Sequence, residues 1–221
     1  MTHIPIELDT LKASLLEMLS LVINQIVKAR SALENFDQEL VEEIARNERR
    51  VDAYELKLNM DCENLLALYS PVANDLRFVL SALRTNYNLE RIGDYAYNIS
   101  TIIRDLEKPI DPEILKEMRI PQMFDISLKM LQMISTAFEN EDSQQARQVF
   151  KKDDRLDEIQ NKSNHTAAEI IKRKPEETLS ILSLLSVIRK LERVGDQTKN
   201  MAEELIFYVE AKVLRHAKKK I

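Results

Sequence analysis

The hexapeptide LERIGD, at Leu89–Asp94, returns as LERVGD at Leu191–Asp196. The 221-residue chain has two glycines, and each lies in one copy of this hexapeptide. A glycine costs a helix interior about 1 kcal/mol relative to alanine. Its use twice at the same place indicates that neither position can accommodate a side chain. The space would serve an ion or ligand, or the close approach of a neighbouring helix.

The hexapeptide belongs to a duplication that covers most of the chain. SALENFD (31–37) aligns with TAFENED (136–142) at an offset of 105 residues. Further on, LERIGDYAYNI (89–99) aligns with LERVGDQTKNM (191–201) at an offset of 102. The second copy has therefore lost three residues in between, near the turn before Pro175. Self-similarity of this kind predicts two structurally related units.

Each unit is expected to be helical. Two glycines and six prolines leave too little turn-forming material for a β-rich fold of this length. Apolar residues recur every three or four positions, as on one helix face, in the series Leu89, Ile92, Ala96, Ile99, Ile103 and Leu106. We predict an all-α protein of two tandem antiparallel three-helix bundles. Their bounds are residues 1–108 and 109–221, joined around Pro109 and Pro112.

Capping residues and prolines set the expected helix ends. Asn35 with Gln38, and Asp142 with Gln145, have the spacing of capping pairs, and Pro71 and Pro175 mark turns. The predicted helices of the first unit run from Ile6 to about Glu34, from the Asn35 cap to Tyr69, and from Val72 to about Glu107. Those of the second run from Pro121 to Glu139, from Asp142 to the turn at Pro175, and from there to about Ala217.

Four pairs of acidic residues, each four positions apart, map onto one another across the duplication. This spacing places both carboxylates on one face of a helix, where their repulsion costs roughly 0.2–0.5 kcal/mol. The pairs are Glu48 with Asp52, Glu90 with Asp94, Asp153 with Asp157, and Glu192 with Asp196. In a chain with 37 Asp and Glu residues, one such pair can arise by chance on a solvated helix face.

The heights of the pairs along the helices make chance a poor explanation for all four. In each unit one pair lies about 20 residues before the turn between the second and third helices, and the other about 20 after it. Antiparallel helices then bring four carboxylates to one level. The apolar pattern places them at the rim or outer surface of each bundle, within reach of water. All-oxygen ligands favour hard cations such as Mg²⁺, Ca²⁺, Mn²⁺ or iron, so the eight acids are candidate metal ligands.

The paired motifs resemble the PhoU family of phosphate-uptake regulators. PVANDLRFVLSALRTNYNLERIGDYAYNI (71–99) is similar to the family's signature in the first unit, and LERVGDQTKNMAEELIFYV (191–209) in the second. The resemblance implies a cytoplasmic, non-enzymatic regulator of phosphate uptake and phosphate-starvation signalling. It also implies divalent or trivalent metal ions, in multinuclear iron or zinc clusters, on the eight acids. One departure is that Asp75 and Arg77 have no counterparts in the second unit.

The expected partners follow from the same resemblance. They are the ATPase subunit of a phosphate ABC transporter and a phosphate-sensing histidine kinase, together with a second copy of the chain in a homodimer. The membrane would be reached only through these partners. A net charge of −5 gives no reason to expect nucleic-acid binding. No N-terminal run resembles a signal peptide, and the longest apolar stretch, LSILSLLSVI, is too short to span a bilayer.

Two alternatives stay open. In a metal-free helical adaptor, the carboxylates would be a solvated face or a contact for a basic partner. In a carboxylate-bridged di-iron enzyme they would be catalytic ligands, but that class uses Glu-x-x-His pairs pointing into a helical core, and no such pair occurs in this sequence. The single cysteine, Cys62, is expected to be a small buried residue.

Overall fold

The structure, a computed structural model, describes residues 4–214 of the chain. Over that range the chain forms seven α-helices and one short 3-10 helix, and no strand. The elements are α1 (Ile4–Asn35), α2 (Gln38–Tyr69), α3 (Ala73–Arg104), α4 (Pro112–Glu117), α5 (Ile120–Asn140), α6 (Ser143–Arg173), η1 (Pro175–Glu177) and α7 (Thr178–Glu210). The predicted all-α fold is confirmed.

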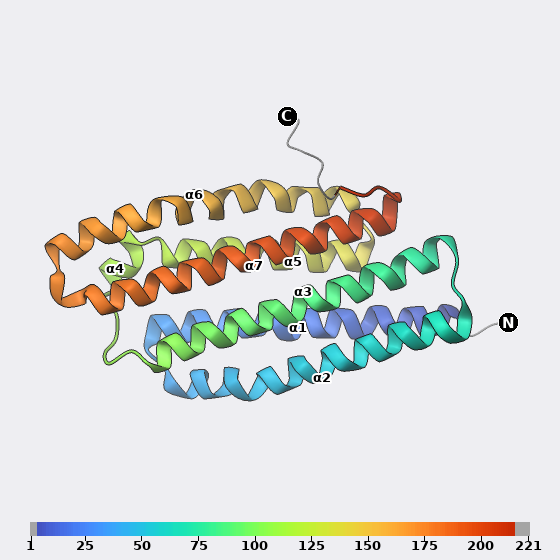
Figure 1. The fold of residues 1–221 in the computed structure, drawn as a ribbon, viewed down its shortest axis with the longest axis horizontal. Coiled ribbons are helices and arrows are strands. Elements are labelled where there is room, and N and C mark those ends of the chain that lie inside the picture. The colour runs from blue at the N-terminus through green and yellow to red at the C-terminus, as the bar shows by residue number, and fades with distance from the viewer. Residues whose placement is uncertain (1–3, 215–221) are drawn as a thin grey trace.

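The long helices form two antiparallel bundles that lie side by side (Figure 1). One bundle contains α1, α2 and α3, the other contains α5, α6 and α7, and the short α4 lies in the connection between them. α3 packs along α7, and α1 contacts α5, so the two bundles share one continuous hydrophobic core. The tandem three-helix bundles predicted from the duplication are confirmed, and their packing joins the two cores.

The first helix, α1, is long and apolar enough to be compared with a membrane span. By length and composition alone α1 could cross a membrane, since an 18-residue window in it has a mean hydropathy of 1.3. The sequence did not predict this, because its uninterrupted apolar runs are short. In the structure Met18, Val22 and Ile26 on this helix are fully buried and face the helices packed around it. A core helix of a globular bundle passes the same test. Cys62, on α2, is also fully buried as predicted, and its thiol points to the Val79 carbonyl.

Several helix ends differ from those predicted. α3 ends at Arg104 rather than Glu107, and α7 ends at Glu210 rather than near Ala217. α7 stops because Ala211 turns into the left-handed region at φ 56° while its N–H still bonds to the Phe207 carbonyl. The tail from residue 215 onward lies outside the described residues. α4 was not predicted, since the connecting segment has no counterpart in the first unit.

The cap of α2 is Asp37, and the predicted cap at Asn35 is wrong. The Asp37 carboxylate accepts hydrogen bonds from the backbone N–H groups of Glu39 and Leu40 at 2.9 and 3.1 Å. Asn35 instead donates to the Ser31 carbonyl within α1. The predicted cap of α6 is confirmed, because Asp142 accepts from the N–H groups of Gln144 and Gln145 at 2.9 and 3.0 Å.

Removing either cap should weaken the fold by a measurable amount. We expect Asp37→Ala and Asp142→Ala each to lower the free energy of unfolding by about 1 kcal/mol, because each leaves two helix N–H groups without an acceptor. The two losses should add in the double variant, since the caps share no partner. Urea unfolding measures them. Asp37→Asn and Asp142→Asn keep an acceptor oxygen and serve as controls; losses as large as those of the alanine variants would contradict the capping role.

The two glycines lie where neighbouring helices cross. A Cβ added to Gly93 would meet Val51 Cγ1 of α2 at 2.9 Å, and one added to Gly195 would meet Leu156 Cδ1 of α6 at 2.5 Å. Contacts under 3.0 Å are closer than real Cβ atoms make. Of the uses considered for this space, the structure therefore shows the close approach of a neighbouring helix at both positions.

Candidate carboxylate metal sites

The first set of predicted acids comes together between α2 and α3. Glu48 and Asp52 lie on α2, Glu90 and Asp94 lie on α3, and Glu48 interacts electrostatically with the other three. The crossing at Gly93 brings the two helices close at this level. The predicted convergence of this quartet, called the α2–α3 cluster below, is therefore present in the structure.

Glu48 has the most unusual environment in the α2–α3 cluster. Both of its carboxylate oxygens are buried, and no protein donor reaches either. Among the surrounding acids, Asp94 acts on this carboxyl group most strongly. Burial, followed by the charges of Asp94, Asp52 and Glu90, raises the pKa of Glu48 to about 8. Near neutral pH this group therefore holds a proton or needs a cation beside it.

A fifth acid belongs to the α2–α3 cluster. Burial, then the charges of Asp94 and Glu55, raises the pKa of Glu90, and Arg91 opposes this shift. Glu55 lies one turn beyond Asp52 on α2 and accepts a hydrogen bond from Asn59. The eight predicted ligands do not include Glu55, although the sequence places it on the same flank of the helix as Glu48 and Asp52. Glu55 lies three residues after Asp52, which also places the two side chains on one helix face, and this spacing could have identified Glu55 as a member of the cluster.

The second set of acids comes together between α6 and α7, here called the α6–α7 cluster. Asp153 and Asp157 lie on α6, Glu192 and Asp196 lie on α7, and both Asp153 and Glu192 interact with Asp157 and Asp196. Asp153 is only 3% exposed, and burial raises its pKa. The pKa of Glu192 is raised by burial and then by the charge of Asp196, with Arg193 opposing.

Unlike the α2–α3 cluster, the α6–α7 cluster contains a lysine. Lys199 Nζ donates to Oδ2 of Asp153 and, at 3.1 Å, to Oδ1 of Asp196. Burial lowers the pKa of Lys199, but the hydrogen bonds and charges of Asp153 and Asp196 outweigh it, so that the pKa lies above its ordinary value. Lys199 was not identified from the sequence. It lies three residues after Asp196 and seven after Glu192, on the same helix face, and that spacing is the signal that marks it.

The predicted position of the acids at the outer surface is only partly right. Asp52 is exposed, whereas the oxygens of Glu48 are buried and Asp153 is almost completely buried. Each of these two acids lies three residues before a core residue, Val51 or Leu156. Because the helices cross closely at the two glycines, the neighbouring helix covers both acids.

The two clusters differ in how well they fit a metal ion. The unpartnered, buried oxygens of Glu48 are oxygen ligands without a donor, which suits a hard cation. In the α6–α7 cluster the corresponding residue, Asp153, already has an ammonium group on one oxygen. With the side chains as they stand, no group of three or more His, Cys, Asp or Glu residues in 4–214 is arranged so that it could hold a metal ion. Binding would therefore require side-chain rotation.

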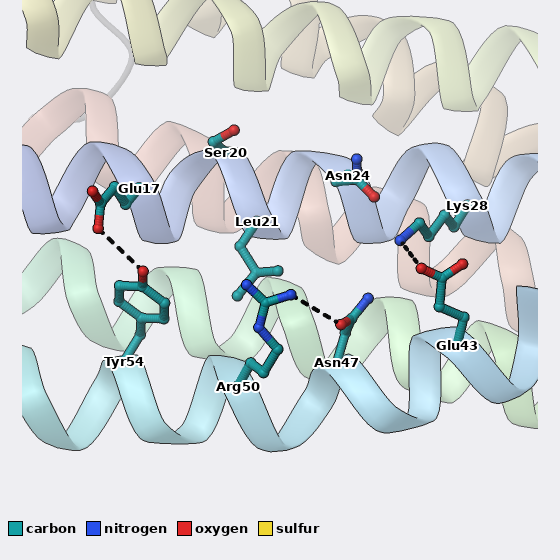
Figure 2. A pocket seen from close by; sticks show the side chains of 9 residues that line it. All are labelled: Glu17, Ser20, Leu21, Asn24, Lys28, Glu43, Asn47, Arg50 and Tyr54. Carbon is teal, nitrogen blue, oxygen red and sulfur yellow. Dashed lines mark hydrogen bonds and ion pairs between the residues drawn. The ribbon is translucent and has the colours of Figure 1, made fainter.

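A surface groove lies away from both clusters. It has a volume of about 380 Å³, runs between α1 and α2, and contains none of the eight predicted acids. Two pairs cross the groove, Lys28 with Glu43 at 2.7 Å and Tyr54 with Glu17 at 3.1 Å, and Arg50 bonds to Asn47 on its own helix at 3.3 Å (Figure 2). Two acids, Glu17 and Glu43, balance two basic residues, Lys28 and Arg50, so the groove has no excess charge with which to attract an ionic ligand.

Comparison with known proteins identifies the family. Residues 15–103 and residues 120–205 each match the model of the PhoU domain. The chain belongs to the PhoU family. The resemblance predicted from the two hexapeptides and their upstream acids is thus confirmed, and both matched segments contain one copy of the hexapeptide.

Relatives within the PhoU family match over nearly full length. The phosphate-specific transport system accessory protein PhoU homolog 1 of Thermotoga maritima is 32% identical over 93% of this chain and 88% of its own. The accessory protein PhoU of Escherichia coli is 25% identical over 95% of this chain and 86% of its own. A PhoU homolog of Aquifex aeolicus is 30% identical over 95% and 94%.

Solved PhoU structures have the same fold. PhoU from Pseudomonas aeruginosa superposes with a TM-score of 0.88 at 28% identity, covering 94% of this chain and 99% of that one. The phosphate transport system regulatory protein PhoU from Streptococcus pneumoniae gives a TM-score of 0.84 at 28% identity, covering 96% and 99%. The agreement extends over both bundles.

Proposed function

We propose that this protein is an accessory protein of a phosphate-specific transport system that regulates phosphate uptake and phosphate-starvation signalling. The observation that carries the proposal is the match of both halves to the PhoU domain, together with near full-length relatives that are named as phosphate-specific transport accessory proteins. The protein would act by binding, in the cytoplasm, to the transporter's ATPase subunit and to a phosphate-sensing histidine kinase. A homodimer is part of the same proposal, and catalysis is not.

Deletion and complementation test the regulatory role. We expect a strain that lacks the gene to show altered phosphate uptake and raised phosphatase expression in phosphate-rich medium, and the wild-type gene to reverse both. Unchanged uptake and expression after deletion would refute the proposal. A pull-down with the host's transporter ATPase and sensor kinase, both in purified form, identifies which of the two is bound.

We also propose that the carboxylate clusters bind hard metal ions as part of this function. Burying a carboxylate without a partner is costly, and in the α2–α3 cluster Glu48 has no donor while the charges of three other acids act on it. A divalent or trivalent ion would offset the repulsion among Glu48, Asp52, Glu90 and Asp94. The other four predicted ligands are the matching acids of the α6–α7 cluster: Asp153, Asp157, Glu192 and Asp196. The family resemblance implies that the metal is iron or zinc, held as multinuclear clusters.

Metal content tests this second proposal. Untagged wild-type protein, loaded with Fe²⁺ or Mn²⁺ and desalted, should retain metal, and Glu48→Gln/Asp94→Asn should lose the share that the α2–α3 cluster holds because it removes two of its ligands. Elemental analysis by mass spectrometry measures it. Asp154→Asn/Glu158→Gln is the matched control, since these acids have the same four-residue spacing on α6 but are not members of either cluster. Equal retention by all three proteins would refute the metal site.

A metal-free adaptor is the second candidate for the role of the clusters. The observation that favours it is that each cluster has an internal way to lower its charge: the proton held near Glu48 and the ammonium group of Lys199. If the wild type and Glu48→Gln/Asp94→Asn both lack metal but bind the transporter ATPase equally well, the adaptor is the correct description.

A further inference from the structure

The two clusters have diverged at two of the positions that the duplication relates. At the offset of 102, Lys199 corresponds to Tyr97, and at the offset of 105, Gln160 corresponds to Glu55. Both differences make the α6–α7 cluster less negative than the α2–α3 cluster. The α6–α7 cluster has four carboxylates with Lys199 and Arg193 beside them. The α2–α3 cluster has five carboxylates with Arg91 beside them.

Lys199 brings a positive charge between the two helices of the α6–α7 cluster. Its ammonium group bonds to Asp153 on α6 and to Asp196 on α7, so it links the two helices through one carboxylate from each. Asp153 is 4% exposed at its side chain, and Lys199 is 30% exposed. Tyr97, in the equivalent place, brings no positive charge to the α2–α3 cluster.

We infer that Lys199 is a built-in cation that replaces the metal ion in the α6–α7 cluster, so that the α2–α3 cluster is the metal centre of this chain. The inference rests on the proposed metal function and narrows it from two centres to one. A metal ion entering the α6–α7 cluster would have to displace the ammonium group from a nearly buried aspartate. The displaced lysine would then lose both of its carboxylate partners. In the α2–α3 cluster no such displacement is needed, because no protein donor reaches Glu48.

Mn²⁺ binding to matched variants of the full chain tests the inference. We expect Glu90→Gln/Asp94→Asn to abolish Mn²⁺ binding and Glu192→Gln/Asp196→Asn to leave both the amount bound and the affinity unchanged. Titration followed by electron paramagnetic resonance of free Mn²⁺ measures this directly. Loss of binding in the second variant, with retention in the first, would overturn the inference, and so would equal partial losses in both.

Replacing Lys199 should open the second centre. Lys199→Gln is expected to bind additional Mn²⁺, and adding Glu192→Gln/Asp196→Asn to it should remove the additional ion. Lys199→Arg keeps a cation and should bind no more Mn²⁺ than the wild type. An unchanged amount of Mn²⁺ in Lys199→Gln would count against lysine as the group that closes the cluster.

Thermal unfolding separates this inference from the metal proposal it rests on. In metal-free protein Lys199→Gln should melt roughly 5 °C below the wild type, because Asp153 loses its partner, and Lys199→Arg should melt close to the wild type. Asp153→Asn/Lys199→Gln should recover part of the loss. If no protein in the set binds Mn²⁺, the metal proposal fails. The melting temperatures still decide the role of Lys199, which is refuted if Lys199→Gln and Lys199→Arg melt alike.

Discussion

Glu48→Gln should make the metal-free protein more stable than the wild type at pH 8.5, by about 2 kcal/mol once solvent screening of this half-buried group is allowed for, and equally stable at pH 5. The reason is that burial and the neighbouring acids raise the pKa of Glu48 to about 8 from an ordinary 4.5. Between these two values the folded protein keeps a proton that the unfolded chain releases. The free energy of unfolding of the wild type therefore falls as the pH rises through this window. Glutamine has no proton to lose there.

Urea unfolding in EDTA at pH 5, 7 and 8.5 measures the effect. Glu42→Gln is the matched control, since it removes the same charge from the exposed face of the same helix. The pKa values of Glu90, Glu192 and Asp153 are also raised, so these groups likewise make the free energy of unfolding of the wild type fall as the pH rises. The comparison between Glu48→Gln and the wild type isolates Glu48. If the two free energies differ by the same amount at all three pH values, the carboxyl group is not held protonated in the folded protein.

A bound cation should reverse this order. A metal ion binds the ionised form of Glu48, and its binding adds stability that grows with the ratio of free metal to Kd, about 2.7 kcal/mol at a hundredfold excess over Kd. The wild type with saturating Mn²⁺ at pH 8.5 should therefore exceed Glu48→Gln in stability. The same substitution would be stabilising without metal and destabilising with it, which no purely structural role of Glu48 predicts.

The fold was predictable because its determinants are local and repeated. Prolines and periodic apolar residues marked the long helices, and α2 ends at Tyr69 as Pro71 required. The duplication could have corrected the wrong cap at Asn35. Asp37 aligns with Asp142, so a cap at Asp142 in the second unit predicts a cap at Asp37 in the first. α4 could not be found in this way, since no second copy of its sequence exists to compare.

The candidate site was predictable in its membership but not in its chemistry. Spacing alone showed which acids share a helix face and at what height. It did not show that the oxygens of Glu48 would be buried, because that depends on how closely α3 crosses α2. The spacing within α7 places Lys199 on the same face as Glu192 and Asp196, but it does not show that the lysine side chain reaches across to Asp153 on α6.

Gly93→Val should be the most damaging single substitution at the helix crossings, lowering the free energy of unfolding by about 3 kcal/mol. The first added carbon alone would lie 2.9 Å from Val51 Cγ1. Val51 is β-branched and has one strongly preferred rotamer in a helix, so it cannot swing away. At Gly195 the first atom met is Leu156 Cδ1 at 2.5 Å, the end of a flexible side chain, with Asp153 Oδ1 next at 3.1 Å. We expect Gly195→Ala to be better tolerated, and part of its effect to fall on the contact between Asp153 and Lys199.

Smaller substitutions decide what the first glycine is for. Gly93→Ala gains about 1 kcal/mol of helix propensity but meets the same methyl group, so we expect a net loss of about 1 kcal/mol. Val51→Ala removes that methyl group, and in the double variant the two changes should be less harmful than the sum of the single ones. Urea unfolding of the four proteins in EDTA gives the coupling. If the glycine instead kept room for an ion, Gly93→Ala would leave metal-free stability unchanged or improved and would weaken only Mn²⁺ binding. A positive coupling with Val51 in the absence of metal therefore assigns the glycine to the helix crossing, and through it to the depth at which Glu48 is buried.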